Sequence, residues 1–182
     1  MRVRSLEFDV FVHPEHDPGC FGKSHGFLTP FLRQYGKALV IFDREGCGAE
    51  HQSREAIELE VESRLSQNGW EDRTAAIALD PEVEAWVWAG SPLVDELLGW
   101  AGREPGLRTW LRSQSYLRGD EAKPARPKEA LEHALRLAQK ARSAALFQRL
   151  AERVSLDRCT DAAFAKFRAT LQRWFSTGSS PS

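Results

Sequence analysis

Cysteine is scarce in this chain, and long apolar runs are missing from it. Only three cysteines occur among 182 residues, and their odd number and wide spacing argue against a disulfide framework or a zinc site with paired ligands. No apolar run approaches the roughly 20 residues that a helix needs to cross a bilayer. The first residues also lack the apolar stretch and cleavage site of a signal peptide. We therefore expect reduced thiols, no membrane contact and a cytoplasmic protein.

The chain does have enough apolar sequence for one well-packed domain. Hydrophobic residues make up 42% of it, and no internal repeat divides it. We expect a single domain over residues 1–175, with the sheet core in residues 1–90 and a helical extension in residues 91–175. The tail, residues 176–182, is small and polar and is expected to be disordered.

Charge is balanced overall but unevenly distributed. The formal net charge is −1. From Lys123 to the end there are 12 Lys/Arg against 5 Asp/Glu, and before Lys123 there are 13 against 21. This split has two interpretations: acidic and basic faces that match within the protein, or a basic surface for nucleic acid or an acidic partner.

Apolar periodicity predicts alternating strands and helices in the first half. Strands are expected at residues 6–12, 37–43 and 74–80, and helices at 27–35 and 53–69, with the intervening 13–26 as a loop. Ser53 is a candidate N-cap and Gly69 a helix stop. This order predicts an α/β fold of Rossmann-like character, with a parallel sheet of about three or four strands. The loops after Phe42 and Leu79 should then open at one edge of the sheet.

The second half is predicted to be helical. Helices are expected at about residues 81–90, 91–100, 127–141, 142–154 and 160–175, with Ser91 and Pro92 at the start of the second. The tryptophans of this half favour core or interface positions over base stacking: Trp86, Trp88, Trp100 and Trp110.

Acidic residues follow two of the predicted parallel strands. Asp43 and Glu45 come after the strand at 37–43, and Glu82 and Glu84 come just after Asp80. Carboxylates that converge at strand ends form an oxygen site suited to Mg²⁺ or Mn²⁺. The alternative is that Asp43 caps a turn, Glu45 is solvated and Glu82 lies in the first turn of a helix, where the helix dipole favours an acid.

A stiff basic loop precedes the helix predicted at 127–141. Lys123, Arg126 and Lys128 stand beside a helix start, where cations and backbone N–H groups could receive a phosphate. The alternative is a solvated loop. The first interpretation makes these three residues a nucleic-acid contact.

Two further groups of residues have a chemical and a structural interpretation. Cys47 near His51 resembles a nucleophile with its base, but a small loop or core thiol is the favoured interpretation because no third group orients the histidine. His13, His16 and His25 are either additional metal ligands or exposed loop residues.

Four segments carry a resemblance to a known family. The segments KALVIFDREGCG, LDPEVEAWVW, KPARPKEAL and RCTDAAFAKFRATLQRWF resemble small TOPRIM-like proteins found with prokaryotic anti-phage defence genes, in particular a component of the methylation-associated defence system. The likeness covers about Leu6 to Phe175. It implies partner proteins from a defence system.

In TOPRIM domains, a glutamate after the first strand and an Asp-x-Asp pair after a later one hold Mg²⁺ for cleaving or joining nucleic-acid strands. Asp43 and Glu45 resemble the pair, with Glu in place of the second Asp. The strand ending in glutamate and glycine is missing, and Glu7 lies inside a predicted strand. Glu82, Glu84 and Trp86 match a motif of two glutamates before an aromatic residue in more distant relatives.

The resemblance leads to two hypotheses. The first is a Mg²⁺-dependent nuclease. Its metal ligands would be Asp43, Glu45, Glu82 and Glu84. In it Glu45 and Glu82 take part in catalysis, and Lys123 or Lys128 positions the scissile phosphate. The second is a non-enzymatic adaptor or sensor subunit of a defence complex. Acids that converge favour the first, and acids paired with arginines favour the second.

Overall fold

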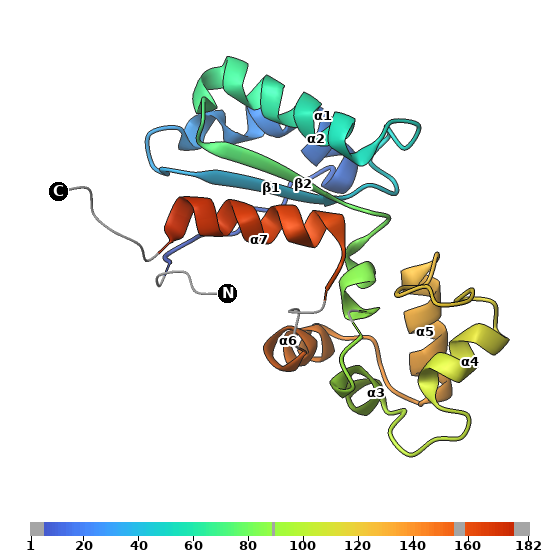
Figure 1. Cartoon of the computed structure of the whole chain (residues 1–182). Helices are drawn as coiled ribbons and strands as arrows, with labels where there is room; N and C mark the ends of the chain where they lie inside the picture. Colours follow the sequence, from blue (N-terminus) through green and yellow to red (C-terminus); the bar gives the residue numbers. More distant parts are fainter. Residues whose placement is uncertain (1–5, 89, 155–158, 177–182) are drawn as a thin grey trace. The chain divides into compact units, whose positions relative to one another are not determined.

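The computed structural model describes residues 6–88, 90–154 and 159–176. These residues form two compact units (Figure 1). The sheet unit contains the described residues up to Asp80 together with those from Ala162 onward, and the helical unit contains those of Pro81–Asp161. The sequence predicted the end of the sheet core at residue 90, later than the boundary after Asp80. It also assigned the last helix to the helical extension, whereas this helix belongs to the sheet unit.

Two parallel strands form the sheet. Strand β1 (Ala38–Asp43) pairs with β2 (Thr74–Leu79) in a register that joins Ala38 to Thr74 and Asp43 to Leu79. Every residue of β2 after Thr74 is buried, as expected for a strand covered on both faces. The predicted α/β class and the common edge for the two strand ends are confirmed. Within the described residues the sheet has these two strands, fewer than the three or four predicted.

Carboxylates from a helix take the place that a third strand would have beside β2. The N–H groups of Ala76 and Ala78 donate to Glu62 Oε1 at 2.9 Å and to Glu58 Oε1 at 3.0 Å. A buried backbone N–H needs an acceptor, and an unpaired strand edge is prone to aggregation. Both glutamates come from α2 (Arg54–Leu65), so this helix satisfies the outer side of β2.

Helices cover both faces of the sheet. Figure 1 shows α1 (His16–Leu28) and α2 on one face and α7 (Ala162–Phe175) on the other. Short turns follow α1 (Thr29–Phe31) and α2 (Ser66–Trp70). Ser53 caps α2 by accepting the N–H of Ala56, and Gly69 ends the following turn at φ +88°. These two predictions are confirmed, because both signals are local.

The beginning of the chain differs from the prediction. Residues 6–12, predicted as a strand, have no strand structure, and much of the predicted loop forms α1. The Phe11 ring packs against Phe31, with centroids 4.4 Å apart, and Tyr35 donates a hydrogen bond to Asp9. This segment thus alternates as a strand does but is held by side chains rather than by a ladder.

Glycine inside α1 permits a close approach that its helix propensity does not reveal. A Cβ on Gly19 would lie 1.9 Å from His13 Nδ1, so the histidine ring occupies the space of the missing side chain. His13 is buried and accepts the N–H of Glu15 at 3.1 Å. The glycine-rich sequence predicted as a loop is therefore a helix with one glycine at a packing contact.

The helical unit is built around tryptophans. Its elements are a 3₁₀ turn (Val83–Trp88), α3 (Leu93–Leu98), α4 (Leu107–Ser113), α5 (Pro127–Leu137) and α6 (Ala144–Arg153). The indole N–H groups of Trp88 and Trp100 donate to the carbonyls of Pro127 and Ala134. Trp100 and Trp110 lie with ring centroids 4.7 Å apart. These three are buried, in agreement with the favoured core interpretation.

No helix in the described ranges is long and apolar enough to cross a membrane. The tail predicted to be disordered lies, apart from Ser176, outside the described residues.

Candidate functional site

The acids predicted for the sheet edge lie where β1 and β2 end. The Asp43 N–H donates to Asp17 Oδ1 at 3.0 Å, and Glu45 is exposed in the next turn. Arg44 lies between the strand ends, with its guanidinium 3.3 Å from Asp80 Oδ1. The same side chain also donates to backbone carbonyls of the following loop, at 2.6 and 2.8 Å. An arginine therefore supplies the positive charge beside Asp80 at this edge.

The two acids of the helical unit are engaged in its internal structure. Glu84 is 1% exposed and its carboxylate lies 2.5 Å from the Arg142 guanidinium. That hydrogen bond raises the pKa of Arg142. Glu82 is buried and accepts the backbone N–H of Lys128 at 2.8 Å, at the first turn of α5. Each carboxylate ties together segments that are far apart in the sequence.

The predicted phosphate-binding loop is largely paired with acids. Lys123 Nζ lies 2.6 Å from the buried Asp161 carboxylate, which also accepts the Trp86 indole N–H at 3.1 Å. Arg126 pairs with Glu129 at 2.6 Å. Lys128 is exposed and contributes its backbone N–H to the contact with Glu82. Lys123 and Arg126 therefore have protein partners where the prediction gave them a phosphate.

Among the residues that the structure describes, no three His, Cys, Asp or Glu side chains form a group that could hold a metal ion. His13 packs on Phe27, with ring centroids 4.9 Å apart, and belongs to the packing of α1. Cys47 is 2% exposed, and burial raises the pKa of its thiol, which disfavours the nucleophilic thiolate. His51 is exposed. These observations agree with a structural role for Cys47.

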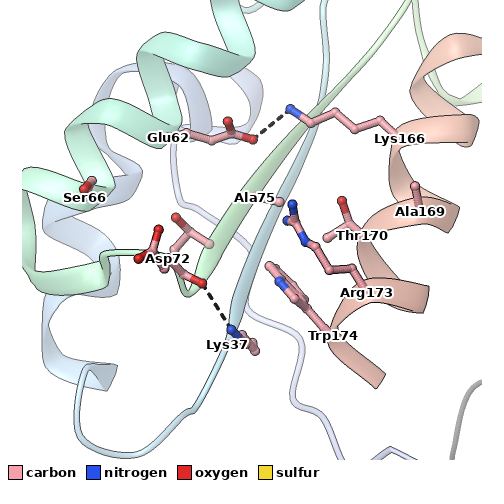
Figure 2. A pocket seen from close by; sticks show the side chains of 11 residues that line it. Lys37, Glu62, Ser66, Asp72, Ala75, Lys166, Ala169, Thr170, Arg173 and Trp174 are labelled. Atoms are coloured by element: carbon pink, nitrogen blue, oxygen red, sulfur yellow. Dashed lines mark hydrogen bonds and ion pairs between the residues drawn. The ribbon is translucent and has the colours of Figure 1, made fainter. Parts of the chain in front are cut away.

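A pocket that the sequence did not reveal lies in the sheet unit, between α7 and the start of β2. Its volume is 790 Å³. Figure 2 shows Arg173 and Trp174 extending from α7 toward Ala75 of β2, with Lys37 and Asp72 on the opposite wall. Hydroxyl groups complete the lining: Ser66, Thr74 and Thr170.

Three cations line this pocket, and they differ in their bonding partners. Lys166 Nζ is held by Glu62 at 2.7 Å and by Glu58 at 3.1 Å. Lys37 Nζ donates to the Asp72 carbonyl at 3.1 Å and lies 5.4 Å from the Trp174 ring centroid. Neither of these two contacts brings a carboxylate to Lys37. Arg173 is exposed and has no hydrogen-bond or ion-pair partner among the described residues.

Helical spacing is the signal that could have indicated one wall of the pocket. The lining residues of α7 follow a spacing of three, four, seven and eight from the first, which places them on one face: Lys166, Ala169, Thr170, Arg173 and Trp174. The other wall comes from Lys37 and Asp72, which no spacing links to α7. The sequence showed a basic second half but did not locate this concentration of charge.

Comparison with protein-family models, curated proteins and solved structures finds no match for this chain.

Proposed function

We propose that this chain is a binding subunit, an adaptor or sensor, which takes a phosphate-bearing ligand in the pocket between α7 and β2. The observation that carries the proposal is that Arg173 and Lys37 both line one pocket. Among the described residues, neither side chain is bound to a carboxylate. A guanidinium offers five donors in a planar fork, and an ammonium offers three, so both can bind phosphate oxygens.

The state of two of the four predicted metal ligands also supports a binding role. A carboxylate that coordinates Mg²⁺ must present its oxygens to the ion. Glu84 is instead buried and paired with Arg142, and Glu82 is buried and accepts the backbone N–H of Lys128. Acids paired with arginines are the arrangement that favours an adaptor. The resemblance to defence-associated proteins gives the proposal a setting, in which ligand binding is passed to a partner of a defence complex.

The parallel strand ends favour a second candidate function. Asp43 stands opposite Leu79 in the register, beside exposed Glu45. In a TOPRIM-type domain this is where an acidic pair holds Mg²⁺ or Mn²⁺ for nucleic-acid cleavage. This candidate requires a metal-dependent activity that Asp43→Asn removes.

The first test measures phosphate binding at the pocket. Melting curves of the full chain are recorded in inorganic phosphate, with sodium chloride at matched ionic strength as reference. Selective binding to the folded state raises the melting temperature. Phosphate also stabilises proteins in general by exclusion from their surface, so variants are needed. Arg173→Gln should weaken phosphate binding at least about ten-fold, the loss of one hydrogen bond to a charged group.

The matched control is Arg33→Gln, since Arg33 is an exposed arginine of the same unit outside the pocket. It should bind phosphate as the wild type does. An equal phosphate effect in all three proteins contradicts the proposal. Incubation with plasmid, single-stranded DNA and RNA, in Mg²⁺, Mn²⁺ or EDTA, tests the second candidate. Cleavage that needs a metal and disappears in Asp43→Asn would place the nuclease first.

A further inference from the structure

The pocket between α7 and β2 is too large and too varied for a bare phosphate ion. Its 790 Å³ falls in the range of about 300–1,000 Å³ that is typical of sites for small organic ligands. Its lining combines cations, carboxylates, hydroxyls and one indole ring. The occupant should therefore carry an anionic group, hydrogen-bond donors and an apolar flat part.

The aromatic ring stands next to the cations. Lys37 Nζ lies 5.4 Å from the Trp174 ring centroid, and Arg173 is the residue before Trp174 on α7 (Figure 2). A phosphate held by Lys37 and Arg173 would bring the next atoms of its ligand to the indole. Indole stacks well on heterocycles, and such stacking tolerates different bases.

Acidic side chains in the same lining limit how much negative charge the ligand can carry. Glu62 and Asp72 both line the pocket, and Lys166 is already paired with Glu58 and Glu62. The lining therefore has three cations against two carboxylates, a formal charge of +1, so each phosphate after the first adds negative charge that the pocket does not compensate. Hydroxyl groups of the lining can exchange hydrogen bonds with a sugar or with an exocyclic amine.

We propose that the pocket binds a nucleoside monophosphate, with its phosphate on Arg173 and Lys37 and its base against Trp174. This inference rests on the proposed binding function and specifies its ligand. A nucleoside triphosphate or a nucleic-acid strand fits less well, because both bring additional negative charge to a pocket lined by Glu62 and Asp72.

The test is calorimetric titration of the full chain with AMP, GMP, CMP and UMP, and with ribose 5-phosphate, adenosine, ATP and a short single-stranded oligonucleotide. At least one monophosphate should bind about five-fold or more tightly than ribose 5-phosphate, the lower limit of a stacking contribution. Adenosine, ATP and the oligonucleotide should bind more weakly than that monophosphate.

Two substitutions separate the ring from the charge. Trp174→Leu should reduce the affinity for the monophosphate to that for ribose 5-phosphate, and the affinity for ribose 5-phosphate should not change. Trp174→Phe should restore part of the difference between the two affinities. Arg173→Gln should weaken the binding of both ligands. Phe8→Leu, at an aromatic residue that is 76% exposed and outside the pocket, is the control. Circular dichroism and melting curves verify that each variant is folded.

The possible outcomes test the nucleotide assignment separately from the phosphate-binding function. Equal binding of every monophosphate and ribose 5-phosphate would overturn the nucleotide assignment and leave the phosphate site standing. Tighter binding of ATP or of the oligonucleotide would also overturn it. Failure of every phosphate-bearing ligand to bind would refute both proposals.

Discussion

Replacing Glu84 by Gln distinguishes a structural ion pair from a metal ligand. In the ion-pair interpretation the substitution removes the charge that faces Arg142. Breaking a fully buried pair costs about 3–5 kcal/mol. The Arg142 side chain is 44% exposed and can be solvated once Glu84 is neutral. The loss should therefore be close to that of one charged hydrogen bond, about 2 kcal/mol.

The reciprocal substitution should cost more. Arg142→Gln leaves the carboxylate of Glu84, a residue 1% exposed, without its guanidinium. An uncompensated buried charge is the more expensive outcome, so we expect a loss of about 3–4 kcal/mol. The double variant should cost less than the two single losses together, because the residues interact directly.

Urea unfolding followed by tryptophan fluorescence measures these losses, since four of the six tryptophans belong to the helical unit. Glu104→Gln, at an exposed glutamate of the same unit, should change the free energy of unfolding by less than about 0.5 kcal/mol. A metal ligand behaves in the opposite way: without metal, removing one of several repelling carboxylates leaves stability equal or higher. A stable Glu84→Gln variant, with Mg²⁺ stabilising only the wild type, would refute the ion-pair reasoning.

Two further predictions concern packing and pH. Gly19→Ala should destabilise the protein by about 1–3 kcal/mol because its Cβ would overlap the His13 ring, whereas Gly22→Ala, with open space around it, should stabilise α1 by up to about 1 kcal/mol. Equal changes in the free energy of unfolding for the two variants, measured in urea, would show that the His13 ring moves aside and would contradict this prediction. Burial raises the pKa of Asp95, so the folded state retains this proton to a higher pH than the unfolded state does. The contribution of Asp95 to stability is therefore greatest below its unfolded pKa and is lost as the pH rises through its folded pKa. The gain in the free energy of unfolding from pH 3 to pH 7 should therefore be larger in Asp95→Asn than in the wild type. The same pH dependence in both proteins would contradict this.

Local signals in the sequence predicted the elements on which the sheet unit rests. The apolar runs at β1 and β2, the Ser53 cap and the stop at Gly69 all depend on neighbours within a few residues. Such signals do not show whether a strand finds a partner. Residues 6–12 alternate correctly, yet Phe11 packs on Phe31 and Tyr35 outside the sheet.

The candidate sites were decided by tertiary structure. The sequence by itself determined the α/β class, the parallel pair of strands and the common edge where Asp43 and Asp80 lie, because periodicity and strand order follow from local sequence. It could not assign partners to charges, since Arg142 and Glu84 are 58 residues apart and both have many possible counterions nearer along the chain. Likewise, Lys37 and Trp174 meet only because α7 packs on β2. Ion pairing and pocket formation depend on distance in space, which chain folding sets and residue order alone does not.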